Sequence, residues 1–190
     1  MRKHEWHRRT IRYSGFNYSL RGAYFVTICT RKREWLFGEV KNGEMVENEV
    51  GRIVKNEWDQ TPEKRHNVDI DEFQIMPNHM HFIVFINDCY SDALYGRGVL
   101  QYAPTTKIDG IYPITKLRSP SQTVGAIVRG FKSASTKRIN ELLDLPGTPV
   151  WQRNFYERVI RNESELNAVR KYIVENPLKW ESDPDRDVIR

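Results

Sequence analysis

An apolar run from His79 to Ile86, preceded by Met76, Pro77 and Asn78, constrains the fold of this 190-residue chain more than any other segment. The run is short and rich in branched and aromatic side chains, which is typical of a β-strand entered through a tight turn. Successive side chains of a strand point to opposite faces, and both faces of this run are apolar beyond its first residues. A strand with two apolar faces is central in its sheet and covered. Its first residues therefore lie at the entrance of a buried strand, where a cleft can form.

His79 and His81 stand two residues apart at this entrance, so they point to the same face of the predicted strand. Two imidazoles side by side on a rigid strand can bind one metal ion. A His-x-His pattern on a strand is by itself more often unrelated to metal. The metal interpretation therefore depends on what the rest of the chain adds.

The remaining segments predict the element order β-α-β-β-α-β-α. The predicted elements are strands at 22–30, 68–75, 79–86 and 150–160, and helices at 46–59, from a cap at Ser119 or Ser121 to about 141, and from a cap at Asn162 or Ser164 to Asn176, where Pro177 ends the helix. The first six match the ferredoxin-like split βαβ arrangement, an α+β fold with an antiparallel sheet and helices on one face. The last helix is an addition to this arrangement, and it carries Tyr172.

Two local signals add detail to this order. Asn42 and Gly43 are typical of a hairpin turn. The alternation of the strand at 68–75 slips around Asp71 and Glu72.

Length and composition predict one domain with a real core. Residues 1–21 form a basic, aromatic arm, residues 22–180 form the domain, and residues 181–190 form a short tail. Residues 87–118 are rich in Gly, Pro, Asp and Tyr without a clear period, which indicates a long loop insertion.

The net charge of +5 and the pI of about 9.2 favour a polyanionic partner, although simple solubility explains such a charge as well. The two cysteines, Cys29 and Cys89, indicate neither a disulfide framework nor a cysteine zinc site. The basic N-terminus lacks the apolar stretch of a secretory signal, and no apolar run is long enough to span a bilayer. We therefore expect a cytoplasmic protein with no membrane partner.

Tyr172 and Asn176 are four residues apart, so they share one face of the last predicted helix. If that helix lies against the sheet, Asn176 can complete a metal site with the histidines and hold Tyr172 over it. The pattern suggests a metal-assisted tyrosine nucleophile that acts on a phosphodiester. Other interpretations stay open: Tyr172 can be a packing residue, Asn176 a helix cap, and spacing alone does not select Tyr172 over Tyr156.

Four segments in a fixed order resemble one known family: Met76–Phe82, Gly130–Ser133, Trp151–Arg161 and Tyr172–Pro177. Together they resemble the REP-associated tyrosine transposases, a domesticated branch of the single-tyrosine HUH transposases, whose name denotes His, a hydrophobic residue and His. The resemblance covers roughly residues 10–180. The combination of segments is specific, whereas each segment alone is weak.

The resemblance implies a role for each residue of the pattern. His79 and His81 would be metal ligands, Asn176 the third ligand, and Tyr172 the nucleophile that forms a 5′-phosphotyrosine. The cofactor would be a divalent metal, Mg²⁺ or Mn²⁺. The substrate would be single-stranded DNA at the hairpins of repetitive extragenic palindromes in a bacterial cytoplasm. Because each chain has one such tyrosine, two cleavages require two rounds or two chains, and a homodimer is one possibility.

Basic side chains then become candidate phosphate contacts. These DNA-binding candidates are Arg8, Arg9, Arg12, Arg129, Lys132, Arg153, Arg158 and Arg161. Trp151, Phe155 and Tyr156 are candidates for stacking on bases. The cations could equally form an ordinary solvated face, and the aromatics could be core residues.

The leading hypothesis is therefore a metal-dependent single-stranded DNA endonuclease and strand transferase. A catalytically silent hairpin-binding regulator on the same scaffold is one alternative. The intact set of site residues argues against it, because a non-catalytic protein would have no need to keep them: His79, His81, Tyr172 and Asn176. A metal phosphoesterase that activates water instead of tyrosine is another.

Overall fold

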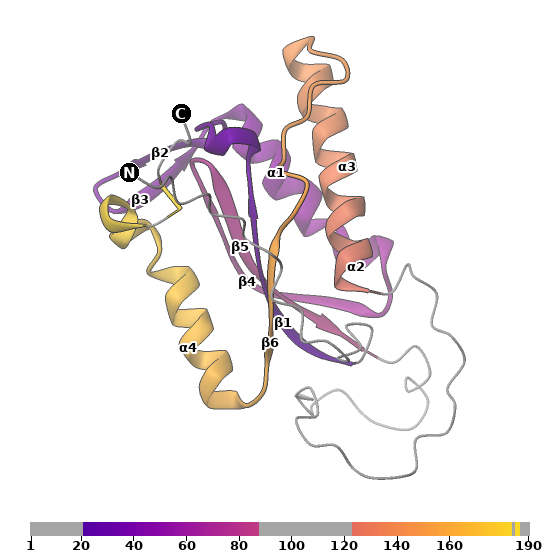
Figure 1. The fold of residues 1–190 in the computed structure, drawn as a ribbon, viewed down its shortest axis with the longest axis vertical. Helices are drawn as coiled ribbons and strands as arrows, with labels where there is room; N and C mark the ends of the chain where they lie inside the picture. Colours follow the sequence, from indigo (N-terminus) through magenta and orange to yellow (C-terminus); the bar gives the residue numbers. More distant parts are fainter. Residues whose placement is uncertain (1–20, 88–122, 184, 187–190) are drawn as a thin grey trace, which may run out of the picture.

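The computed structural model describes residues 21–87, 123–183 and 185–186 (Figure 1). Almost all of the predicted N-terminal arm, including Arg8, Arg9 and Arg12, lies outside these residues, as does the predicted loop insertion from residue 88 onward. In the part of the chain that is described, no helix is both long and apolar enough to span a membrane.

The core of the protein is a four-stranded antiparallel sheet in the order β4-β5-β1-β6. Its strands are β1 (Gly22–Cys29), β4 (Val68–Met76), β5 (His79–Ile86) and β6 (Tyr156–Ile160). Helix α1 (Glu49–Asp59) and the short α2 (Thr61–Lys64) connect β1 to β4, and α3 (Val124–Leu143) precedes β6. With the sheet strands counted along the chain, the order is second, third, first, fourth, which is the ferredoxin-like order. The predicted α+β fold class is confirmed.

The two faces of the sheet are covered by different helices (Figure 1). On one face, Phe82 of β5 packs with Trp58 of α1 and Phe131 of α3 in the larger core. On the other face, Ile83 packs against α4 (Glu163–Val174), the helix that carries Tyr172. The prediction that β5 is central and apolar on both sides is therefore correct, and its bounds are those that the sequence predicts.

Strand β4 contains a bulge between Ile70 and Phe73, at the position where the alternation of the sequence slips. The bulge includes Asp71, which accepts hydrogen bonds from the guanidinium of Arg170 on α4, with an Nη2–Oδ2 distance of 2.5 Å. The irregular position in β4 therefore helps to hold α4 against the sheet.

Helix α1 starts at Glu49 rather than at residue 46 because the preceding residues belong to a hairpin. Its strands are β2 (Gly38–Lys41) and β3 (Glu44–Glu47), joined by Asn42 and Gly43, whose φ values of 53° and 78° match the predicted turn. Asn48 caps α1 by accepting a hydrogen bond from Gly51 N, as an N-cap asparagine does.

The predicted cap of α3 at Ser119 or Ser121 is wrong. Thr123 is the cap, and its hydroxyl accepts a hydrogen bond from Ala126 N at 3.1 Å. Serine and threonine supply equivalent caps, so composition alone did not choose among neighbouring hydroxyl residues.

The last strand is shorter than its predicted range of 150–160. Val150 is buried and Trp151 makes only an isolated bridge to Thr30 before β6 begins at Tyr156. Trp151 is a core residue, and its indole N–H donates to the Ser135 hydroxyl, so it is not available to stack on a base.

Helix α4 begins at the predicted cap Asn162, which accepts a hydrogen bond from Glu165 N. The helix ends at Val174 and not at Asn176. The chain tightens there, with Asn176 N bonded to Ile173 O at 3.2 Å, and continues as the 3₁₀ helix η3 (Pro177–Ser182). A proline cannot donate a helical hydrogen bond, so Pro177 ends the regular helix earlier than expected.

Candidate metal and tyrosine site

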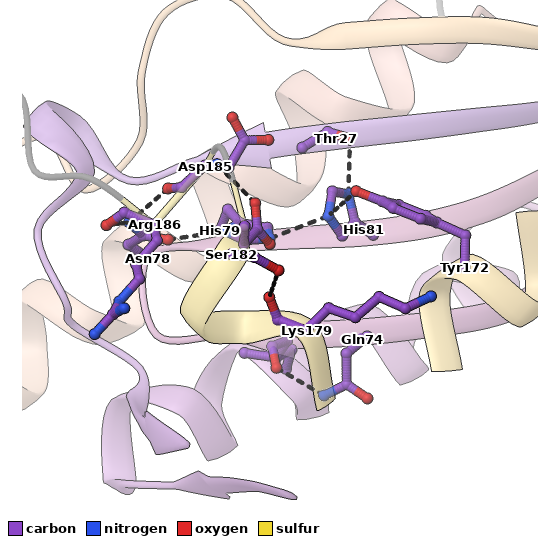
Figure 2. A network of polar contacts seen from close by, with 12 residues as sticks. Thr27, Gln74, Asn78, His79, His81, Tyr172, Lys179, Ser182, Asp185 and Arg186 are labelled. Carbon is purple, nitrogen blue, oxygen red and sulfur yellow. Dashed lines mark hydrogen bonds and ion pairs between the residues drawn. The ribbon is translucent and has the colours of Figure 1, made fainter. Parts of the chain in front are cut away.

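His79 and His81 lie at the start of β5 on the face covered by α4, and both side chains are almost completely buried. Their Nε2 atoms face each other at 3.1 Å (Figure 2). The strand fixes this geometry, because residues two apart share one face and β1 and β4 pair on either side.

Each histidine is oriented through its other ring nitrogen. His79 Nδ1 lies 2.8 Å from the amide oxygen of Asn78, and His81 Nδ1 lies 2.8 Å from the hydroxyl of Thr27. The amide nitrogen of Asn78 donates to three backbone carbonyls, so its oxygen is the group that faces the ring. That oxygen can only accept, which places the proton of His79 on Nδ1 and leaves Nε2 with its lone pair.

Burial lowers the pKa of both imidazoles: that of His81 falls to about 4, and that of His79 lies well below 6.5. Both rings are therefore neutral near pH 7, as metal ligands must be. The Nε2–Nε2 distance of 3.1 Å is short enough that both nitrogens could bind one ion.

Two oxygen atoms complete the candidate site. Asp183 follows η3, and its Oδ2 lies 3.6 Å from His79 Nε2. The ligand atoms of His79, His81 and Asp183 all lie within 4.8 Å of one another, a group that could hold a metal ion. Asn176 is buried, and its side chain lies beside both His79 and Asp183. Among the described residues, neither Asn176 Oδ1 nor Asp183 Oδ2 has a hydrogen-bond partner. The donor set of two nitrogens and two oxygens thus suits a divalent ion.

The hydroxyl of Tyr172 lies 3.3 Å from His81 Nε2 (Figure 2). The ring packs edge-on against Phe25 and His81, yet the residue is 39% exposed. The hydroxyl oxygen thus lies at the histidine pair while the ring borders solvent. Tyr156, the competing tyrosine, lies on β6 and packs against Phe25. The structure therefore brings Tyr172, His79, His81 and Asn176 together around one point.

The candidate phosphate contacts are divided between the two faces of the sheet. Arg129 and Lys132 belong to α3, on the face opposite the histidines. The ammonium of Lys132 donates to the carbonyls of Gln152 and Asn154, and burial lowers the pKa of Lys132 to about 8. This lysine already has partners within the protein, so it is poorly placed to bind a phosphate.

Arg158 lies on the same side as the histidines. It pairs in register with Phe25, which faces α4, and its guanidinium forms an ion pair with Glu165 of α4 at 2.6 Å. Arg153 and Arg161 are exposed on either side of β6.

The sequence analysis did not single out Asp183, which stands in the segment predicted as a tail. Asp185 in the same segment is buried and forms an ion pair with Arg33 at 2.6 Å. The sequence signal is two aspartates around a proline, beginning three residues after Trp180, and they carry no period that would connect them to β5.

No model of a known protein family matches the chain. An uncharacterized protein from Haemophilus influenzae is 38% identical over 182 residues, which cover 93% of this chain and 92% of that protein. Among solved structures, a REP-associated tyrosine transposase bound to a REP hairpin is 17% identical, with a TM-score of 0.49, over 86% of this chain and 72% of that one. A candidate transposase from Deinococcus radiodurans is 14% identical, with a TM-score of 0.46, over 86% of this chain and 95% of that one.

Proposed function

This chain belongs to the same family as the uncharacterized protein from Haemophilus influenzae, and we propose that it is a metal-dependent DNA endonuclease and strand transferase. Its substrate is single-stranded DNA beside a palindromic hairpin, and its intermediate is a tyrosine joined to a 5′-phosphate. The observation that carries the proposal is the 3.3 Å distance between the Tyr172 hydroxyl and Nε2 of His81.

In this proposal, Nε2 of His79 and Nε2 of His81 would hold one Mg²⁺ or Mn²⁺ ion, and the side-chain oxygen of Asn176 would be a further ligand. When bound, the ion supplies Lewis-acid stabilisation of negative charge on a phosphate oxygen. The buried, neutral histidines and the buried side chain of Asn176 beside His79 support this assignment.

Tyr172 is the nucleophile. Its phenolic oxygen forms a bond to phosphorus while the bond from phosphorus to the 3′ oxygen breaks, and the departing strand takes up a proton to become a 3′-hydroxyl. An ordinary phenol has a pKa near 10, so Tyr172 needs nearby positive charge or a base to lose its proton. The residue is 39% exposed, so the proton can pass to solvent. One phosphodiester bond is exchanged for another, so the step needs no ATP and is reversible.

The hairpin as substrate rests on the order of the four motifs in the sequence, and the basic character of the chain supports a nucleic-acid partner. Arg158 is the proposed phosphate contact on the side of the site. Arg153 and Arg161, exposed near the two ends of β6, are further candidates. Tyr156 is half-buried on the same strand and can stack on a base next to the cleaved phosphate. We place this activity in the bacterial cytoplasm.

A covalent protein–DNA adduct tests the proposal. The full chain is incubated with labelled single-stranded hairpin DNA, with Mn²⁺ or with a chelator, and the products are separated on a denaturing gel. We expect a metal-dependent shifted band in the wild type and in Tyr156→Phe, and none in Tyr172→Phe. Tyr172→Phe removes one hydroxyl and leaves the ring packing intact, so DNA binding should survive.

The same gel separates the alternatives. Cleavage without an adduct, unaffected by Tyr172→Phe, would indicate a phosphoesterase that activates water. Hairpin binding without cleavage in either metal would indicate a silent DNA-binding protein.

A further inference from the structure

We propose that Asp183 is a carboxylate ligand of the same metal ion, and that residues 183, 185 and 186, here called the C-terminal segment, are therefore part of the active centre. The inference rests on the proposed function only in that it requires the metal site. It gives the ion a negatively charged ligand that follows η3 and belongs neither to β5 nor to α4.

The two carboxylate oxygens of Asp183 have different surroundings. Oδ1 accepts a hydrogen bond from the backbone N–H of Asp185 at 2.6 Å, which fixes the side chain. Among the described residues, Oδ2 has no partner at normal hydrogen-bond geometry; the side chain of Asn176 lies beside the carboxylate, and His79 Nε2 lies 3.6 Å from Oδ2. The side chain is 2% exposed, so bulk solvent does little to compensate its charge. One oxygen is thus anchored, and the other points to the atom that would bind the ion.

An unpartnered buried carboxylate oxygen is costly unless a cation neutralises it. The guanidinium of Arg33 is nearby, but it donates to the backbone oxygen and to a carboxylate oxygen of Asp185, both at 2.6 Å. Arg33 and Asp185 therefore balance each other, and the charge of Asp183 is left over. The neutral histidines do not offset it. A divalent cation at the Nε2 atoms would.

The C-terminal segment is held against the start of β5 by the residue that orients His79. The amide nitrogen of Asn78 donates to the backbone oxygens of Asp185 and Arg186, while its amide oxygen faces His79 Nδ1 (Figure 2). One side chain therefore sets the positions of two proposed ligands. Asn78 and Arg33 are positioning residues, since each acts through Asp185 or His79 and not on the ion.

Trp35 and Trp180 pack against each other and contact Arg186 of the C-terminal segment. The rings of Trp35 and Trp180 lie 5.4 Å apart, and the indole N–H of Trp35 donates to the backbone oxygen of Arg186. The guanidinium of Arg186 lies 5.9 Å from both rings. These contacts join η3, the turn after β1 and the C-terminal segment, so Asp183 is held beside the histidines in a fixed position.

A charged ligand predicts tighter binding of a divalent ion than neutral ligands give. Binding of Mn²⁺ to the full chain, without DNA, is measured by calorimetry and by the Mn²⁺ electron paramagnetic resonance signal. We expect Asp183→Asn to weaken Mn²⁺ binding by about tenfold or more. Glu141→Gln is the matched control, because Glu141 is an exposed carboxylate on α3, on the opposite face of the sheet, and it should leave the affinity unchanged. Equal Mn²⁺ affinity in Asp183→Asn and wild type would overturn the inference.

Thermal unfolding separates a ligand from a merely structural residue. Asparagine keeps an oxygen that can accept from Asp185 N and removes the uncompensated charge. In chelator, Asp183→Asn should therefore unfold at the same temperature as the wild type or above it, and with Mn²⁺ it should gain less than the wild type does. A lower unfolding temperature in chelator, with an unchanged gain from Mn²⁺, would assign Asp183 a structural role and contradict the inference.

Two further variants distinguish failure of this inference from failure of the proposed function. His79→Ala should abolish Mn²⁺ binding, and Tyr172→Phe should retain it while losing the adduct. If His79→Ala abolishes binding and Asp183→Asn does not change it, only the role of Asp183 is wrong. If the wild type itself binds no Mn²⁺, the metal centre and the proposed function fail together with this inference.

Discussion

The two faces of β5 differ in what their side chains do, although the same strand supplies both. The face toward α1 and α3 is a continuous apolar core, in which the ring of Phe82 lies 4.1 Å from that of Trp58. The face toward α4 has a smaller apolar cluster that ends at His79 and His81, where buried nitrogens and oxygens converge. The face toward α1 and α3 therefore stabilises the fold. The face toward α4 holds buried polar groups close together, away from solvent, on the same rigid strand.

The largest expected effect separates function from stability on the α4 face. His81→Ala should reduce metal-dependent cleavage by about a thousandfold or more, because it removes a metal ligand next to the nucleophile. Its free energy of unfolding in chelator should fall by only about 1–3 kcal/mol, since a buried hydrogen-bonded ring is lost rather than a large apolar side chain. Cleavage assays and urea unfolding measure both quantities. A variant that unfolds easily and still cleaves would reverse the roles of the two faces.

The opposite face should show the opposite result. Phe82→Ala is expected to lower the free energy of unfolding by about 3–5 kcal/mol, because a fully buried aromatic side chain leaves a cavity. Phe85 is the matched control on the α4 side of the same strand, where it is only partly buried. Phe85→Ala should therefore cost clearly less in the same urea titration, and equal costs would show that the two faces contribute alike.

The pH dependence of stability should be a property of the histidine face. The pKa of His81 is about 4 in the folded protein and 6.5 ordinarily, so between these values the unfolded chain binds a proton that the folded chain does not. The free energy of unfolding therefore falls as pH falls through this window, by at most about 3 kcal/mol from this group. The shift of His79 acts in the same direction.

Urea unfolding in chelator at pH 7 and at pH 4.5 measures this effect. His81→Asn should show a smaller fall than the wild type, because the titrating group is gone. An identical fall in both proteins would assign the pH dependence to carboxyl groups elsewhere.

The smallest effect concerns DNA contacts on the exposed side of the site. Arg158→Ala should weaken binding to hairpin DNA several-fold at all sequences and reduce the salt slope of the affinity by about 1, as loss of one phosphate contact does. Lys137 on α3 is the matched control, because it is exposed on the other face of the sheet. Fluorescence anisotropy over a salt series gives both values, and a larger loss in Lys137→Ala would place the DNA on the α3 face.

Local patterns in the sequence predicted many of the strands and turns, because hydrophobic alternation and turn residues depend on the conformation of neighbouring residues along the chain. The bounds of β5, the bulge after Ile70 and the turn at Asn42 and Gly43 are examples. The His79–His81 pairing follows for the same reason, since strand geometry alone puts both rings on one face.

The sequence did not predict contacts that depend on the folded chain closing on itself. Arg33 and Asp185 are separated by 152 positions along the chain, and no periodicity connects them. The position of Asp183 depends on that ion pair and on Asn78, which the sequence analysis treated only as a turn residue. Polar contacts of this kind follow from three-dimensional proximity, so composition and spacing do not reveal them.

The most direct test of the account is to identify the residue that becomes linked to DNA. The adduct formed with Mn²⁺ is digested with trypsin, and the DNA-linked peptide is sequenced by mass spectrometry. The account predicts linkage at Tyr172, whose hydroxyl lies 3.3 Å from the nearer histidine. Linkage at Tyr156, or at any other residue, would contradict it.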